Sequence, residues 1–322
     1  MSVRVAQTFR GQWTCFFATC YSVELELFDQ YLFRRLGEPP LNATILCDFD
    51  THARRIDKLD LAQPGQLQRA NRDYLLRGVT AGSSFHPKTY FFGNAKEGVL
   101  LVGSGNLTLR GIEEGHEIFC QFDSSRDDEL GSIRAWRDWM EQIVGRLADR
   151  EVTRRWLDLK ERTREWLPGT ATGSGFVSNF ERSFLDQIGE RLTAPVSELH
   201  VLAPFYDRDA KALEALLQRL QPQTLHLYIG AGTSVDGAAL TAVLERFGGK
   251  VKLIGFDGQP EGKQAIKEGK IYADPIQFPD RIGAETARAF IKYMNGEDVP
   301  KQILIPTALY RKADAAKDPS LQ

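Results

Sequence analysis

Two basic residues two positions apart, His86 and Lys88, form the part of the sequence best suited to chemistry on a phosphodiester. A neutral imidazole is a competent nucleophile near neutral pH and can form a covalent phosphoenzyme. A lysine ammonium stabilises the negative charge that accumulates on the non-bridging oxygens in the transition state. The surrounding residues 83–93 have the pattern of a strand, on which residues two apart share one face. We therefore expect both side chains to point to the same side.

A glycine-rich turn follows the next apolar run, at residues 103–106 (GSGN). Its small residues allow a phosphate to approach the backbone closely. Ser104 and Asn106 can donate hydrogen bonds to phosphate oxygens. Glu117, further along the chain, could accept a hydrogen bond from the second imidazole nitrogen and hold the reactive one outward. The alternative for Glu117 is an ordinary solvated carboxylate, since two other glutamates precede it closely.

These motifs resemble the half-site of the phospholipase D superfamily, in which H-x-K precedes a G-S-x-N turn. The superfamily's usual aspartate after the lysine would fall at Gly93 here. Glu117 instead resembles a feature of a metal-independent nuclease branch that includes some restriction endonucleases. The resemblance implies an endonuclease that cleaves DNA or RNA through a phosphohistidine on His86, without a metal or other cofactor. It also implies that Lys88, Ser104 and Asn106 hold the phosphate.

A complete site in this superfamily contains two H-x-K units, whereas the chain has one. None of the remaining histidines has a lysine two residues later, and we interpret each as a satisfied or surface histidine: His52, His116, His200 and His226. Two copies could pair their His86 residues across a two-fold axis, or the chain could be an inactive scaffold. We favour the homodimer. The sequence does not identify a restriction or helicase partner.

The last residues, 251–322, are similar to the C-terminus of periplasmic sugar-binding proteins. The similarity is close in GFDGQPEG, ADPIQFPDRIG and ILIPTALYRKAD. It implies sugar contacts from Asp257 and Gln277, and hence an alternative function as a sugar-binding or regulatory module. In a two-lobed phospholipase D-like chain, this same region would contain the second H-x-K unit. The sugar-binding-protein-like segment therefore replaces that half-site, which either a natural fusion or an engineered chimera would explain.

The order of strand-like and helix-like segments predicts an α/β fold with phospholipase D-like layered lobes, each a mixed sheet flanked by helices. We expect strands at 13–20 and 42–48, with a helix at 23–36 between them. The predicted domains are a catalytic lobe (1–125), a helical connector (126–189), a second, degenerate lobe (190–250) and the sugar-binding-protein-like segment (251–322). That segment offers further helices and a strand at 302–307, and we expect it to complete the second lobe.

Composition narrows the partners and the location. The net charge is -2 and the pI is about 6.3, so a nucleic-acid partner would have to meet a local basic patch. No run approaches the roughly 20 apolar residues of a membrane span, and none near the start suits a signal peptide. We therefore expect a cytoplasmic protein with buried, reduced cysteines. Arginines and tryptophans alternate over 130–166; we favour tryptophans packed inward over a nucleic-acid-stacking surface.

Overall fold

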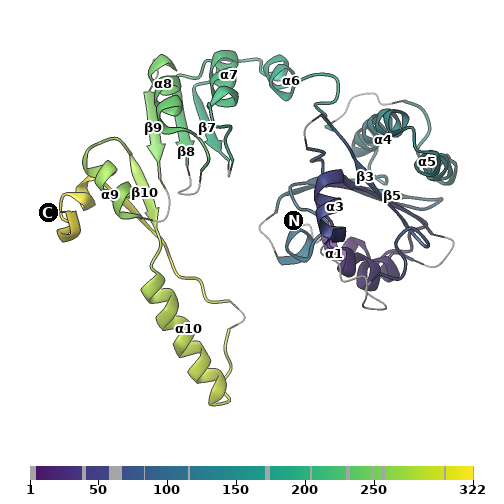
Figure 1. Ribbon diagram of the computed structural model, residues 1–322, viewed down its shortest axis with the longest axis horizontal. Helices are drawn as coiled ribbons and strands as arrows, with labels where there is room; N and C mark the ends of the chain where they lie inside the picture. Colours follow the sequence, from purple (N-terminus) through teal and green to yellow (C-terminus); the bar gives the residue numbers. More distant parts are fainter. Residues whose placement is uncertain are drawn as a thin grey trace. The chain divides into compact units, whose positions relative to one another are not determined.

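The computed structural model describes residues 5–37, 41–57, 67–82, 84–114, 117–170, 175–203, 205–229, 233–247, 250–255, 258–300 and 302–321. The chain forms two compact units, Met1–Glu181 and Arg182–Gln322. Each unit is α/β, with a mixed sheet flanked by helices, as the sequence predicted (Figure 1). None of the described helices is long and apolar enough to cross a membrane.

The first unit is built on a six-stranded sheet in the order β3-β2-β1-β4-β5-β6. β1, β2 and β3 run parallel, whereas β4, β5 and β6 alternate in direction. β1 and β2 are buried along their whole length, which explains their continuous apolar sequences. The strands are β1 (Cys15–Cys20), β2 (Asn42–Asp48), β3 (Leu75–Val79), β4 (Thr89–Gly93), β5 (Gly98–Gly103) and β6 (Phe119–Asp123).

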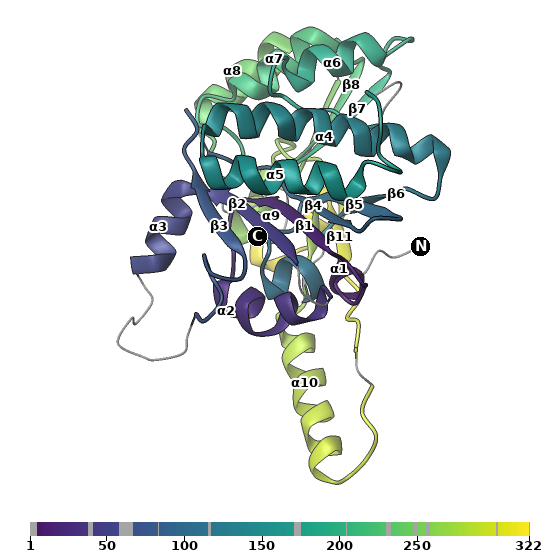
Figure 2. The same ribbon diagram turned by 90° about the vertical axis from the view of Figure 1, so that its right-hand side faces the viewer.

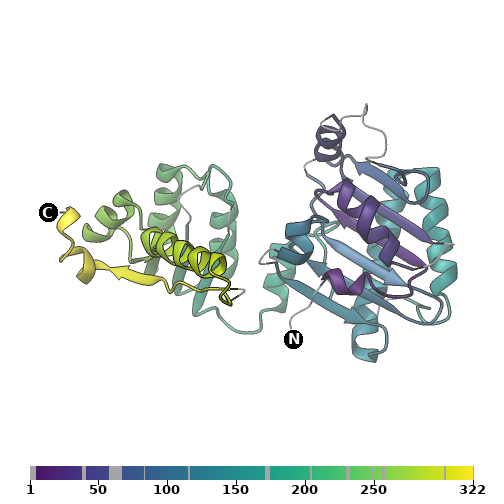
Figure 3. The same ribbon diagram turned by 90° about the horizontal axis from the view of Figure 1, so that it is seen from below.

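Helices cover both faces of this sheet. Figures 2 and 3 show α4 (Asp127–Leu147) and α5 (Arg150–Thr163) together on one face, with the short N-terminal helices on the other. Trp136 and Trp156 are 0% and 1% exposed in the core beneath α4 and α5, so these tryptophans do pack inward. The two helices therefore belong to the first unit, which extends to Glu181, whereas the sequence predicts a separate connector over residues 126–189.

The opposite face carries α1 (Val5–Thr8) and a helical stretch that is less regular than the predicted helix at 23–36. It comprises α2 (Leu25–Leu27), a π-helical turn (Phe28–Leu32) and a 3-10 turn (Phe33–Arg35). The fully buried Asp29 carboxylate accepts backbone N–H bonds from residues 68–70 at 2.8 to 3.1 Å. This contact with a distant loop helps to fix the geometry of the stretch, and hydrophobic periodicity does not reveal it. α3 (Phe49–Asp57) follows β2 directly, and a π-helical turn (Arg110–Glu114) lies between β5 and β6.

The second unit contains a five-stranded sheet in the order β11-β10-β9-β8-β7, parallel except for β11. Its strands are β7 (Glu198–Leu202), β8 (Thr224–Tyr228), β9 (Lys250–Ile254), β10 (Ala273–Ile276) and β11 (Ala308–Arg311). The sugar-binding-protein-like segment, residues 251–322, is called the tail below. It supplies β10, β11 and most of β9, and it therefore completes this sheet. The strand predicted at 302–307 is wrong, because those residues have no regular structure and the strand follows them.

The helices of the second unit differ in how much they pack. They are α6 (Phe184–Arg191), α7 (Lys211–Leu220), α8 (Gly237–Phe247), α9 (Pro260–Lys267), α10 (Pro279–Met294) and α11 (Lys312–Ala315), followed by a 3-10 turn (Pro319–Leu321). α7 and α8 form a core with one face of the sheet. α10 extends away from the sheet (Figures 1 and 2) and buries none of its residues. Its large side chains Phe290 and Tyr293 are therefore exposed.

Candidate functional site

The predicted site residues of the first unit that the structure describes meet where the strands of its sheet end, at the carboxyl ends of β1 and β2. β5 also ends there, and β4 and β6 begin there. The pairing of Thr19 with Thr89 sets the register of β1 against β4. The backbone N–H of Gly103 donates to the carbonyl of Lys88 at 3.1 Å, which sets β5 beside the same segment. Residues at 86–88, 104–106 and 117 are therefore brought together although up to 31 positions separate them (117 − 86).

His86 and Lys88 are in direct contact, but they do not lie on a strand as predicted. β4 begins at Thr89, and residues 84–88 have no regular secondary structure. The Lys88 Nζ atom lies 2.7 Å from Nδ1 and 3.1 Å from Nε2 of the His86 ring. It also donates to the carbonyl oxygen of His86 at 3.0 Å. The side chain of Lys88 thus folds back onto the histidine, and the two basic groups form one unit.

Burial lowers the pKa of both the Lys88 ammonium and the His86 imidazole. Lys88 is 6% exposed, and its burial lowers the pKa of the ammonium to about 8, against the opposing effects of Cys20 and Glu117. The pKa of His86 is lowered by partial burial and then by the Lys88 charge, while Asp48 opposes this shift. Near pH 7 the arrangement is therefore a neutral imidazole beside a buried cation.

Ser104 and Glu117 form a second contact in the same place. The Ser104 hydroxyl donates to Oε2 of Glu117 at 2.5 Å and accepts from the backbone N–H of Ile118 at 3.0 Å. We expected Glu117 to accept a bond from the His86 ring. Among the described contacts its hydrogen bond is to Ser104 instead, and its effect on the His86–Lys88 pair is electrostatic, through Lys88.

Asn106 ties the glycine-rich turn to the end of β1. Its Oδ1 atom accepts backbone N–H bonds from Tyr21 and Ser22, both at 3.1 Å. Because these two bonds hold the amide oxygen, they also fix the orientation of the Nδ2 donor on the same amide group. Gly105 is also required by the packing of the chain itself, besides the close approach of a phosphate that the sequence predicts. A Cβ atom on Gly105 would lie 2.0 Å from the carbonyl oxygen of Gly111, so the chain's own backbone requires the glycine.

Sequence reasoning missed a pocket beside the histidine. It has a volume of about 390 Å³ and is lined by Tyr21, Ser22, Val23, Cys47, Thr51, His52 and Arg54. The Tyr21 ring connects it to the site, since its centre lies 4.7 Å from that of the His86 ring. The pocket residues directly follow the carboxyl ends of β1 and β2, or lie in those ends. That position after two apolar runs was the signal in the sequence.

Asp48, at the end of β2, holds the segment that leads to His86. It accepts backbone N–H bonds from Thr51 and Phe85, both at 3.0 Å. Burial opposes ionisation, yet these hydrogen bonds lower the pKa of Asp48 below its usual value. The ionised carboxylate therefore orders both the start of α3 and the residue before His86.

Several predicted residues lie elsewhere. Gly93 is at the far end of β4 and pairs with Cys15 and Gly98. Gln277 is exposed after β10 in the second unit, whereas Asp257 and His116 lie outside the described residues. Three cysteines are buried as predicted, but Cys120 is exposed, because it belongs to the edge strand β6.

Comparisons with known proteins match parts of the chain. No protein-family model matches it. The ribose import binding protein of Salmonella typhimurium is 45% identical over 49 residues, which cover 15% of this chain and 17% of that protein. The fructose import binding protein of Bifidobacterium longum is 34% identical over 87 residues, covering 27% of this chain and 24% of that protein. The chain thus spans about a quarter or less of the length of these relatives.

A solved structure of a yeast tyrosyl-DNA phosphodiesterase mutant is similar over a longer region. It aligns with 70% of this chain and 59% of its own, at 14% identity and a TM-score of 0.40. At that level the likeness assigns neither a family nor an activity to the chain.

Proposed function

We propose that this chain is a metal-independent phosphodiesterase that cleaves DNA or RNA through a covalent phosphohistidine on His86. The observation that carries the proposal is the buried Lys88 ammonium in contact with the His86 ring. A neutral imidazole supplies the nucleophile, and a cation fixed beside it supplies charge for the phosphoryl oxygens. Together the two groups provide the nucleophile and the charge stabilisation that phosphoryl transfer requires, and no step of the proposal uses a metal ion.

The first chemical step transfers the phosphoryl group to the histidine. A ring nitrogen of His86 attacks phosphorus, and the bond to the leaving oxygen breaks with its electron pair remaining on that oxygen. Lys88 and the Nδ2 donor of Asn106 stabilise the non-bridging oxygens. A water molecule then attacks phosphorus and gives a proton to the base that remains after the leaving oxygen has been protonated. The P–N bond breaks with its electron pair on the ring nitrogen, so the imidazole is regenerated and the product is a phosphate monoester.

An acid must protonate the leaving oxygen, and His86 of a second copy of the chain suits this role. A two-fold interface brings identical residues together, so each copy would supply one histidine to a shared site. One His86 then acts as the nucleophile and the other as the acid. This homodimer accounts for the single H-x-K unit in the chain.

The pocket lined by Tyr21 and Arg54 suits the part of the substrate beside the scissile phosphate. Its volume of about 390 Å³ is large enough for a nucleotide-sized group. The Tyr21 ring offers a surface for base stacking, and the Arg54 guanidinium a partner for a neighbouring phosphate. These contacts supply the local recognition that a chain with a net charge of -2 needs.

The direct test is cleavage of single- and double-stranded DNA and RNA in EDTA by the full-length chain. Activity should persist in EDTA and disappear in His86→Ala and Lys88→Ala. Lys96→Ala is the matched control, because Lys96 is exposed in the turn between β4 and β5, at the far end of both strands. Full cleavage by His86→Ala would exclude the proposal.

A second candidate function is sugar binding by the second unit. It is favoured by the resemblance of residues 251–322 to periplasmic sugar-binding proteins and by the 49-residue match of the chain to ribose import binding proteins. Stabilisation by D-ribose that disappears in Asp257→Ala and Gln277→Ala would support it. Thermal unfolding that ribose leaves unchanged would exclude it.

A further inference from the structure

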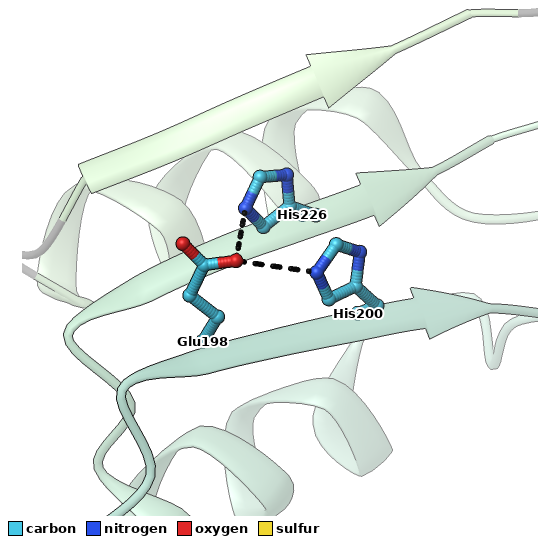
Figure 4. A group of neighbouring side chains, drawn as sticks. All are labelled: Glu198, His200 and His226. Atoms are coloured by element: carbon cyan, nitrogen blue, oxygen red, sulfur yellow. Dashed lines mark ion pairs between the residues drawn. The ribbon is translucent and has the colours of Figure 1, made fainter.

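Two histidines that the sequence analysis interpreted as ordinary lie side by side in the second unit. β7 and β8 are parallel neighbours, and their register places His200 directly opposite His226. Glu198, two residues before His200, shares its face of the sheet. Figure 4 shows these three side chains on the face of the strands opposite the helices. The apolar residues on the other face pack against α7 and α8.

One carboxylate oxygen of Glu198 faces both imidazoles. Its Oε2 atom lies 3.5 Å from Nε2 of His200 and 3.5 Å from Nε2 of His226. His226 is 9% exposed, and its Nε2 atom is buried without a hydrogen-bond partner. A buried nitrogen without a partner is costly unless another group satisfies it. A cation between the carboxylate and the two nitrogens would satisfy all three atoms.

The ligand types and spacing match a late transition metal. Imidazole nitrogen and carboxylate oxygen bind Zn²⁺ at roughly 2.0–2.2 Å, which places two tetrahedral ligands roughly 3.3–3.6 Å apart. The two Glu198–histidine distances of 3.5 Å fall in this range. The three ligand atoms all lie within 4.8 Å of one another. The rings are stacked with centres 4.1 Å apart, so a rotation of the exposed His200 ring is needed to make both lone pairs converge.

A further contact orients one ligand. Nδ1 of His200 lies 3.1 Å from the hydroxyl oxygen of Tyr228. Histidine ligands commonly donate from the ring nitrogen that does not bind the metal. With Nδ1–H of His200 donating to the Tyr228 oxygen, Nε2 keeps its lone pair for the metal.

We infer that Glu198, His200 and His226 bind one Zn²⁺ ion, with its remaining coordination position open to water or a ligand. Two histidines, one glutamate and an open position form a ligand set that zinc uses in hydrolytic sites. The exposed His200 and Glu198 leave this position accessible to solvent. The site belongs to the second unit and is independent of the phosphodiesterase proposed for His86.

Calorimetric titration of the full-length, chelator-treated chain with ZnCl₂ tests this site, and the absorption spectrum of bound Co²⁺ reports its geometry. We expect one ion per chain and tetrahedral Co²⁺ bands. His200→Ala and His226→Ala should each weaken binding at least about tenfold, since each removes a direct ligand. His86→Ala is the matched control, and it should bind zinc as the parent chain does.

The exposed position of His200 makes its variant decisive even if His226→Ala fails to fold. Zinc binding by His200→Ala equal to that of the parent would overturn the site, as would an equal loss in His86→Ala. A parent chain that binds no zinc would overturn it too. EDTA-resistant nucleic-acid cleavage by His200→Ala would separate this site from the proposed nuclease.

Discussion

The Nζ atom of Lys88 lies 2.7 Å from Nδ1 of His86, and the lysine is almost entirely buried. The surroundings lower the pKa of both groups. The ammonium disfavours a second positive charge on the ring, and burial disfavours the charge on the ammonium itself. The pair therefore has a pH interval in which the ring is neutral and the lysine is still charged.

This interval predicts a bell-shaped dependence of kcat/KM on pH. Activity should rise as the attacking His86 loses its proton, at a pH below the usual value for histidine. It should fall as the His86 that acts as the acid loses its proton, and the loss should be complete once Lys88 deprotonates near pH 8. Rates measured from pH 4 to pH 10 with a short oligonucleotide test this. A rate that stays constant from pH 7 to pH 10 would show that Lys88 does not supply the charge.

The same burial predicts that Lys88 reduces stability. Its folded pKa of about 8 lies below the ordinary value of 10.5, so the unfolded chain binds more protons between these values. Lys88→Met should therefore raise the free energy of unfolding at pH 7, by roughly 1–3 kcal/mol after the lost hydrogen bonds are counted, while it abolishes cleavage.

The difference between the two proteins should shrink as the pH rises from 8 towards 10.5, because the parent lysine then becomes neutral. Urea unfolding at several pH values measures it. A Lys88→Met chain less stable than the parent by more than about 1 kcal/mol would contradict this account.

Much of the first sheet could be predicted from the sequence. The apolar runs that form β1 and β2 are continuous because both strands are buried on both faces, and burial of this kind leaves a clear local pattern. The sequence also predicted that the side chains of His86 and Lys88 point to the same side, but not that the lysine folds back onto the ring. Their position before β4 was not predicted, because residues 84–88 have the composition of a strand although β4 begins only at Thr89.

Contacts between distant segments could not be predicted in the same way. Glu117 bonds to Ser104 because β5 and β6 are antiparallel and place Ile118 beside the turn, and spacing alone does not contain that register. The pairing of His200 with His226 likewise follows from the alignment of β7 with β8. Each histidine is the third residue of its own strand. The two rings meet only because β7 and β8 are neighbours in the sheet, and the sequence does not show that they are.

Glu117 should influence catalysis through the charge on Lys88. Its carboxylate raises the pKa of Lys88, so Glu117→Gln should move the alkaline limb of the pH profile to lower pH. We also expect kcat to fall about tenfold, because the Ser104 hydroxyl loses a charged acceptor.

Glu113→Gln is the matched control, since that glutamate is exposed in the neighbouring π-helical turn. pH–rate profiles of both variants provide the measurement. An alkaline limb unchanged in Glu117→Gln would mean that the carboxylate acts only in holding Ser104.

A shared site predicts how mixtures of active and inactive chains behave. If each site needs one His86 from each of two copies, a mixed dimer of parent and His86→Ala chains has no complete site. After subunit exchange, activity per total chain should then follow the square of the parent fraction. An equal mixture would retain about a quarter of the parent activity, whereas independent monomers would retain about half. The measurement is initial cleavage rate against mixing ratio at constant total protein, with Lys96→Ala in place of His86→Ala as the control. A strictly linear dependence would exclude the shared site, and the acid would then have to come from another group within the same chain.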